Sequence, residues 1–368
     1  MTFRFALVLF ACVVTAVCAD RPTVLFMVGE HEYGTKETLP KFAKQLNKLG
    51  VDSVFVQAKS DDRNSLECHE FPGFEKALKK ADLLFLSVRR RYPTPSAMNA
   101  IRDWVKAGKP VMGIRTSSHP FASRPKGKGY QPPKGHVEWL EFDREVLGAE
   151  YTGHYGADDG ECLAAIESKN AAHAILKGIK LPKKPEIPSH LYRSEVVDAK
   201  NVKVLMNGVI KARKVSEPIA WIRTPGTQRI FYTSVGGVED MALPWVRHML
   251  GNAVFWALNE KRPATSAGII GAWKLAVDDP EGTTHHPRIT LRMDKGKLKG
   301  TYTAASDNQD YDALKLRFAD NQLFFTAESF TWTVSYKLKV TGPQMKGTMN
   351  YDIAGFTGKT DIKGTRVQ

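Results

Sequence analysis

Residues 82–114, DLLFLSVRRRYPTPSAMNAIRDWVKAGKPVMGI, contain two apolar runs separated by a helical pattern. The runs DLLFLSV (82–88) and PVMGI (110–114) are continuous, as is typical of strands buried on both faces. Between them, Thr94 stands where a helix N-cap is expected, and Gly108 ends the pattern. This order predicts two parallel strands joined by a helix in a right-handed crossover.

The same alternation continues on both sides of this unit. TVLFMV (23–28) and DSVFV (52–56) are two further strands in this interpretation, with a helix from about Thr38 to Leu49 between them. Later strands and a last helix are predicted at CLAAIE (162–167), KVLMN (203–207), PIAWIR (218–223), RIFYTSV (229–235) and from about Pro244 to Asn259. We therefore expect residues 20–260 to form an α/β domain with a doubly wound, mostly parallel, flavodoxin-like sheet.

The pattern changes after a short polar linker, KRPATSAG (261–268). Residues 269–368 contain no helical periodicity, and their short strands are separated by turn residues such as Gly342 and Pro343. Many short strands with regular turns predict a small antiparallel β-barrel domain.

The N-terminal residues 1–19 combine Arg4 with an apolar run and end in small residues, which predicts a secretory signal peptide cleaved near Ala19. We therefore expect an exported protein, periplasmic or secreted, with no membrane span in the mature chain. Export leaves Cys68 and Cys162, either as one disulfide or as two buried thiols.

Composition limits the function classes. The chain has 368 residues, of which 42% are hydrophobic and 25% charged, so disorder and fibrous repeats are excluded. The formal net charge is +14, but the basic residues are dispersed and form no stripe for nucleic acid. For an exported protein, the charge instead favours an anionic envelope polymer or a polysaccharide as partner.

Ligands of open parallel sheets bind beyond the carboxyl ends of the strands, so the residues that follow each strand are candidates for a site. These are Glu30, His31 and Tyr33; Arg89 and Arg90; Arg115, Ser117 and His119; Asp240; and, from the long loop over 115–160, His136, Trp139, His154 and Tyr155. Carboxylates and guanidinium groups bind sugar hydroxyls, and aromatic rings bind the apolar face of a sugar ring. Histidine and glutamate also suit acid-base chemistry. The pattern thus predicts a site for a small carbohydrate.

Other uses of these residues stay open. The arginines at 89–91 could be solvated or paired on the surface, and His248 belongs to a core helix in this interpretation. Glu30, His31, His119 and His154 could meet around a divalent metal, but no HExxH motif and no close cysteine pair occurs. We therefore predict no cofactor, with a divalent metal as the alternative.

Several ordered motifs resemble the trehalose-utilisation (ThuA-like) family: GIRTSSHPF (113–121), EFDREVLGAEYTGHYG (141–156), SHLYR (189–193) and EPIAWIRTPGTQRIFYTSVGG (217–237). The resemblance spans about residues 22–259. It implies a fold like that of class I glutamine amidotransferases and a role in carbohydrate metabolism. It further implies action on sugars or oxidised (3-keto) disaccharides as a hydrolase or isomerase.

Two positions depart from the amidotransferase pattern. Arg115 stands where amidotransferases have the cysteine nucleophile, and Gly237 stands where ThuA-like chains have a histidine. Glutamine hydrolysis is therefore excluded. If catalysis remains, Glu30 and His119 are the acid-base candidates, Arg115 stabilises negative charge on a substrate oxygen, and His154 assists.

The remaining candidates are expected to bind substrate: His31, Tyr33, Arg89, Arg90, Ser117, His136, Trp139, Tyr155 and Asp240. The alternative is a non-catalytic protein that binds sugar or interacts with the cell envelope. The C-terminal domain resembles a lipocalin-like barrel appended to secreted enzymes.

Overall fold

The structure is a computed structural model that describes residues 21–123, 131–260, 269–294, 297–319 and 321–367. The chain divides into two compact units between Glu260 and Lys261. The predicted signal peptide (1–19) and linker (261–268) lie outside the described residues.

The first unit is built on one eight-stranded sheet with the order β2-β1-β3-β4-β10-β9-β8-β6. Its strands are β1 (Thr23–Gly29), β2 (Asp52–Gln57), β3 (Leu83–Val88), β4 (Val111–Ile114), β6 (Leu163–Ile166), β8 (Val202–Ile210), β9 (Val215–Arg223) and β10 (Ile230–Thr233). From β2 to β10 all neighbours are parallel, which confirms the predicted α/β class. The other edge is antiparallel, because the connection between β8 and β9 is a short turn that leaves no room for a crossover.

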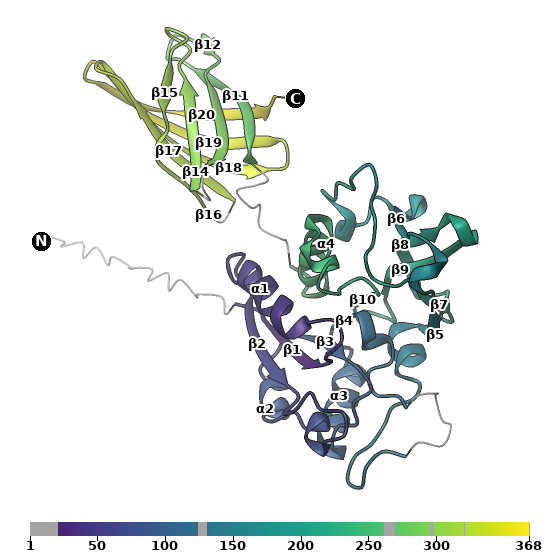
Figure 1. The fold of residues 1–368 in the computed structure, drawn as a ribbon. Helices are drawn as coiled ribbons and strands as arrows, with labels where there is room; N and C mark the ends of the chain where they lie inside the picture. The colour runs from purple at the N-terminus through teal and green to yellow at the C-terminus, as the bar shows by residue number, and fades with distance from the viewer. Residues whose placement is uncertain (1–20, 124–130, 261–268, 295–296, 320, 368) are drawn as a thin grey trace, which may run out of the picture. The chain divides into compact units, whose positions relative to one another are not determined.

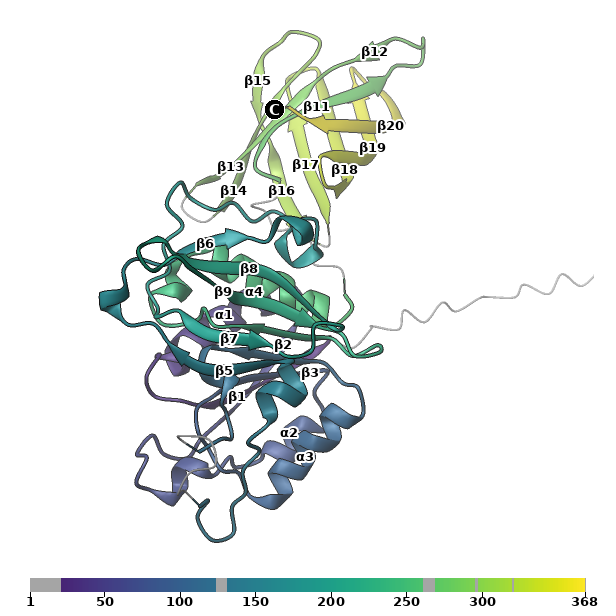
Figure 2. The same ribbon diagram turned by 90° about the vertical axis from the view of Figure 1, so that its right-hand side faces the viewer.

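Helices cover both faces of this sheet, as Figures 1 and 2 show. On one face, α1 (Thr35–Asn47) and α4 (Pro244–Ala257) enclose the larger core cluster, and α2 (Phe74–Leu78) and α3 (Pro95–Lys106) cover the other. The Thr94 hydroxyl caps α3 as predicted, since it accepts a hydrogen bond from the Ala97 N–H. Helix α1 begins three residues before the predicted Thr38, after Gly34 in the left-handed region.

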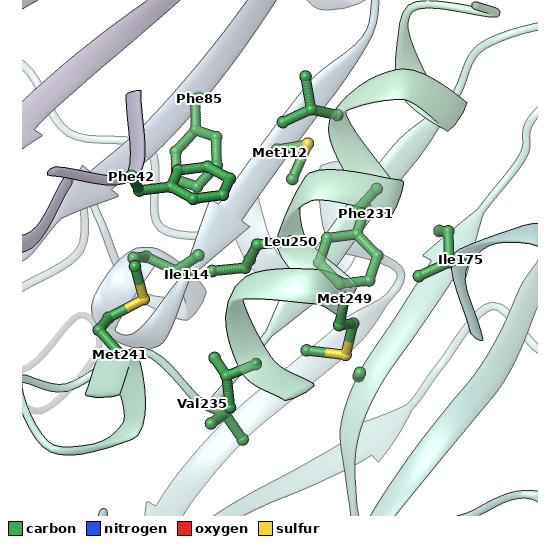
Figure 3. Packing of buried hydrophobic residues seen from close by; sticks show 14 of the residues in the cluster. Phe42, Phe85, Met112, Ile114, Ile175, Phe231, Val235, Met241, Met249 and Leu250 are labelled. Atoms are coloured by element: carbon green, nitrogen blue, oxygen red, sulfur yellow. The ribbon is translucent and has the colours of Figure 1, made fainter. Parts of the chain in front are cut away.

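The face under α4 is a continuous apolar core. Leu250 and Met249 of α4 lie against Met112 and Ile114 of β4 and Phe231 of β10 (Figure 3). This packing fixes the carboxyl ends of β4 and β10 side by side, so the turns that follow these two strands are neighbours.

The first unit also contains a small two-stranded sheet. Strands β5 (Ala149–His154) and β7 (Tyr192–Val196) pair antiparallel, with a bulge between Tyr151 and Gly153. The carboxylate of Asp143 accepts a hydrogen bond from the Tyr151 N–H at 3.0 Å and so fixes the start of β5.

The second unit is a nearly closed, all-antiparallel β-barrel, as predicted. Its strands are β11 (Gly271–Asp278), β12 (Thr284–His285), β13 (Arg288–Asp294), β14 (Lys297–Thr303), β15 (Asp310–Asp312), β16 (Leu314–Ala319), β17 (Gln322–Glu328), β18 (Trp332–Thr341), β19 (Gln344–Ile353) and β20 (Phe356–Arg366). They follow the order β15-β14-β13-β11-β20-β19-β18-β17-β16, and β12 pairs with β11. Alternate residues such as Trp273, Leu275 and Tyr336 fill its interior.

Cys68 and Cys162 are both buried free thiols, so of the two alternatives the structure has the unpaired one. Burial raises the pKa of Cys162 to about 11, and the thiol is therefore inert at neutral pH. In the described part of the chain, no helix has the length and apolarity needed to cross a membrane.

Candidate functional site

The turn after β4 is strained and compact. Arg115 has a φ of 49°, in the left-handed region that non-glycine residues seldom adopt, and it opens a short 3-10 turn, η2 (Arg115–Ser118). The turn folds back on the strand, so that a Cβ at Gly113 would lie 3.1 Å from the Ser117 Cβ. A strained turn of this kind presents one side chain at the end of the sheet, and here that side chain is Arg115.

The Arg115 guanidinium is buried between aromatic rings. Its Nη1 donates to the carbonyl oxygens of His190 and Ser234, each at 2.8 Å. Its central carbon lies 4.1 Å from the Tyr192 ring centre and 4.6 Å from that of Tyr33. Burial opposes the charge, but the surrounding tyrosines and Asp240 outweigh burial and raise the pKa of Arg115. Arg115 is thus a fixed cation at the carboxyl end of the central strand β4.

A group of histidines and tyrosines surrounds this cation. His119 is 4% exposed and stacks on Tyr151 at 4.3 Å, and Tyr151 packs on Tyr192 at 4.8 Å. His154 is paired with Tyr192 across β5 and β7, and its ring lies 5.5 Å from that of His190. We call this set the strand-end cluster: Tyr33, Arg115, His119, Tyr151, His154, His190 and Tyr192.

Glu30 anchors the loop that carries Tyr33, a member of the strand-end cluster. Its carboxylate accepts from the N–H groups of Glu32, Tyr33 and Thr35 at 2.8–2.9 Å and from the Thr35 hydroxyl. Four donors fill the acceptor sites of one carboxylate. The Ser87 hydroxyl extends the network to β3 by donating to the Thr35 oxygen at 2.8 Å.

Asp240 is a second buried carboxylate that anchors backbone segments, here the turn after β10. Its carboxylate accepts from the N–H groups of Gly236 and Gly237 and from the N–H and hydroxyl of Ser189, at 2.5–3.2 Å. The segment before β7 is thereby tied to the turn after β10. Gly237 is buried there, and a Cβ on it would lie 2.7 Å from the Ser189 Oγ and 3.6 Å from Tyr33.

A hollow of about 320 Å³ adjoins the strand-end cluster and shares His190 with it; Ser189, which binds Asp240, also lines this hollow. The segments 156–162 and 186–191 form most of its wall, together with Ile210. Glu161 and Glu186 are among the lining residues, and Lys184 pairs with both of their carboxylates.

The other predicted residues lie around this centre in different settings. His31 accepts from Arg63 Nε at 2.8 Å, and Arg89 pairs with Glu32 at 3.0 Å. Arg90 donates to the carbonyls of Ala122 and Ser123, Ser117 donates to that of Leu86, and Tyr155 donates to Glu217. His136 lies 5.7 Å from the His69 ring, and Trp139 donates to Glu145. Of the predicted set, Tyr33, Arg115, His119 and His154 come together around Tyr192, and Glu30 and Asp240 anchor the adjoining loops.

Sequence reasoning missed Tyr151, Ser189, His190 and Tyr192 as parts of the site. Their signal was present, since EYTGH and SHLYR belong to the motifs that carry the family resemblance. Pairing of β5 with β7 places them next to Arg115, and no local spacing predicts that pairing.

A metal site has no geometric support in the described ranges, where no three His, Cys, Asp or Glu side chains come together to hold an ion. The histidines of the cluster instead contact aromatic rings.

Comparison with known proteins identifies the family of this chain. No curated protein matches it. Among solved structures, it is similar to a ThuA-like protein from Parabacteroides merdae (13% identity, TM-score 0.44, 66% of this chain and 92% of that chain). It is also similar to a β-galactosidase from Bacillus circulans (10% identity, TM-score 0.40, 95% of this chain and 42% of that chain). The family model ThuA, described as trehalose utilisation, matches residues 23–257. The chain therefore belongs to the ThuA family, which is associated with the use of a carbohydrate.

Proposed function

We propose that this protein is exported and binds a small carbohydrate at the strand-end cluster, where it transforms a sugar or an oxidised (3-keto) disaccharide by acid-base chemistry. The observation that carries the proposal is the convergence of three tyrosines and three histidines on the buried Arg115. Family membership supports the carbohydrate context.

Each side chain of the cluster has a role that suits such a ligand. Arg115 stabilises negative charge that develops on a substrate oxygen, such as that of a keto group. His119 transfers a proton, and the Ser118 hydroxyl, 2.9 Å from its Nδ1, helps to fix the ring orientation. His154 assists from β5. Tyr33 and Tyr151, both partly exposed, offer ring faces and hydroxyls to the sugar.

Glu30 and Asp240 act as positioning residues in this proposal. Each carboxylate already accepts hydrogen bonds from four donors of its own surroundings, so neither has an acceptor site left for a substrate proton. Their contribution is to hold Tyr33 and the turn at Gly237 against Arg115.

A second function, sugar binding without turnover, is favoured by one observation. Gly237 occupies the place of the family's histidine, and its surroundings are filled by Ser189 and Tyr33. A chain that lacks this histidine keeps the aromatic and cationic contacts of a binding site.

Product analysis separates the two functions. The mature protein is incubated with trehalose and with 3-keto disaccharides, and products are followed by chromatography beside His119→Gln and His154→Gln. Turnover that falls at least 100-fold in His119→Gln supports catalysis. Saturable binding without product supports the second function, and neither binding nor product across the panel contradicts both.

A further inference from the structure

Arg91 is a buried cation whose charge is not matched. Its side chain is 2% exposed, and its Nε and Nη2 have no hydrogen-bond partner. Across the described ranges Arg91 makes no ion pair, although its backbone N–H donates to the Pro120 carbonyl at 2.8 Å. A buried charge is strongly unfavourable unless a partner of opposite sign approaches it.

Further positive groups surround Arg91 instead of a carboxylate partner. Arg63 and Arg89 both lie close enough to influence its charge, and burial is the largest effect that lowers the pKa of Arg91. His31 lies beside these three arginines, because Arg63 donates a hydrogen bond to its Nε2 at 2.8 Å. Burial and the arginines 63, 91 and 89 lower the pKa of His31 as well.

The structure also shows how a carboxylate fits between these groups. Glu32 Oε1 lies 2.5 Å from Arg63 Nη2 and 3.0 Å from Arg89 Nη2. The Glu32 side chain is 32% exposed, so it can turn into solvent and leave both guanidinium groups to another anion. Asp61 lies close enough to favour the charged form of Arg91, but its carboxylate pairs with Lys36 at 2.5 Å and forms no ion pair with Arg91.

We propose that Arg91, Arg63, Arg89 and His31 form an oxyanion-binding site that takes a carboxylate or phosphate group in place of Glu32. Arginine suits such groups because its planar fork donates two hydrogen bonds to one oxyanion. The site lies at the carboxyl ends of β1 and β3, where ligands of such sheets bind. This site deepens the proposed function, because it implies that the bound sugar carries an anionic group. Binding of the anion itself does not depend on the proposed function, whereas its attachment to a sugar does.

A purely structural Arg91 is the competing explanation. Its stem packs beside Gly29, where an added Cβ would lie 3.3 Å from Arg91 Cγ and 2.7 Å from the Phe71 ring. Arg91→Met retains an apolar stem of similar length and removes only the charge. The two explanations therefore differ in what this variant does to anion binding.

Thermal unfolding of the full chain tests the site with inorganic phosphate and sulfate at constant ionic strength. We expect the midpoint of the wild type to rise by roughly 5 °C at about 100 times the dissociation constant. Arg91→Met should respond by less than 1 °C, while Arg213→Met, which removes an exposed arginine, should respond like the wild type. This control also subtracts the general stabilisation that such salts give.

Two further variants test the same site if Arg91→Met does not fold. Arg89→Met should bind phosphate at least tenfold more weakly, and Glu32→Gln should bind it at least threefold more tightly because the competing carboxylate is gone. An unchanged response in all three variants, or no response of the wild type beyond that to chloride, would overturn the proposal.

A third arm identifies the source of the anion. Glucuronate and glucose 6-phosphate are compared with glucose and with free phosphate. Tighter binding of the charged sugars supports a sugar-borne group. Binding of free phosphate alone supports the oxyanion site and contradicts the proposed sugar function, so the two can fail separately.

Discussion

The guanidinium carbon of Arg115 lies 4.1 Å from the centre of the Tyr192 ring, which joins the turn after β4 to strand β7. This contact unites two segments that are remote in sequence and closes the strand-end cluster. Its consequences for stability and binding can be measured.

Replacement of Arg115 should destabilise the first unit. Arg115→Met leaves the His190 and Ser234 carbonyls without their donor and removes two cation–ring contacts, so we expect a loss of about 2–4 kcal/mol. Urea denaturation followed by tryptophan fluorescence measures it. Arg213→Met, which breaks an exposed ion pair, should lose less than about 1 kcal/mol, and equal effects of the two would contradict the burial argument.

Replacement of Glu30 should loosen the loop that carries Tyr33. In Glu30→Gln, the amide NH₂ faces N–H groups that now donate to a carboxylate, and we expect a loss of about 2–3 kcal/mol. Hydrogen exchange at the Tyr33 and Thr35 amides should accelerate at least tenfold. The exposed Glu37 provides the control, and Glu37→Gln should leave both amides protected. Protection that persists in Glu30→Gln would rule out the anchor role.

A side chain at position 237 should conflict with Ser189. The Cβ of Gly237→Ala would lie 2.7 Å from the Ser189 Oγ, so we expect a loss of about 1–2 kcal/mol. The double variant with Ser189→Gly should recover about 1 kcal/mol of this, because the clash disappears. A double-mutant cycle by urea denaturation tests the coupling, and strictly additive losses would show that position 237 has room for a side chain.

Stability should depend on pH through His69. Burial, Arg91 and His136 lower the pKa of His69 to about 4, whereas the unfolded chain takes up this proton near pH 6.5. The unfolded state therefore binds more protons between these values, and the stability contributed by neutral His69 falls as pH decreases from about 6.5 to 4.

The comparison with His69→Gln isolates this effect. From pH 7 to pH 4.5, the wild type should lose about 2 kcal/mol more than the variant, as measured by urea denaturation at each pH. A constant difference between the two proteins across this range would show that His69 titrates normally.

Much of the fold follows from local sequence. Continuous apolar runs such as 82–88 and the cap at Thr94 specify the parallel strands and α3 directly. The antiparallel edge does not follow from them, because a buried strand has the same apolar composition in either direction. The short turn at Lys211–Arg213 was the available signal, since it excludes a crossover between β8 and β9.

The site is less predictable than the fold. The rule that ligands bind beyond strand ends identified Arg115 and His119, which do lie in one cluster. It gave no means of separating Glu30, whose acceptor sites are filled by its own loop, from a carboxylate that faces a ligand. It also missed Tyr192, whose position depends on the pairing of β5 with β7.

The most direct test of the account is calorimetric titration of sugars and 3-keto disaccharides into the wild type, His119→Ala and His285→Ala. His119 lies in the strand-end cluster, whereas His285 is an exposed residue of the barrel that pairs with Asp279. We predict that the wild type and His285→Ala bind the same sugar with equal affinity, and that His119→Ala binds it at least tenfold more weakly. Equal affinity in all three proteins would contradict a sugar site at the strand-end cluster.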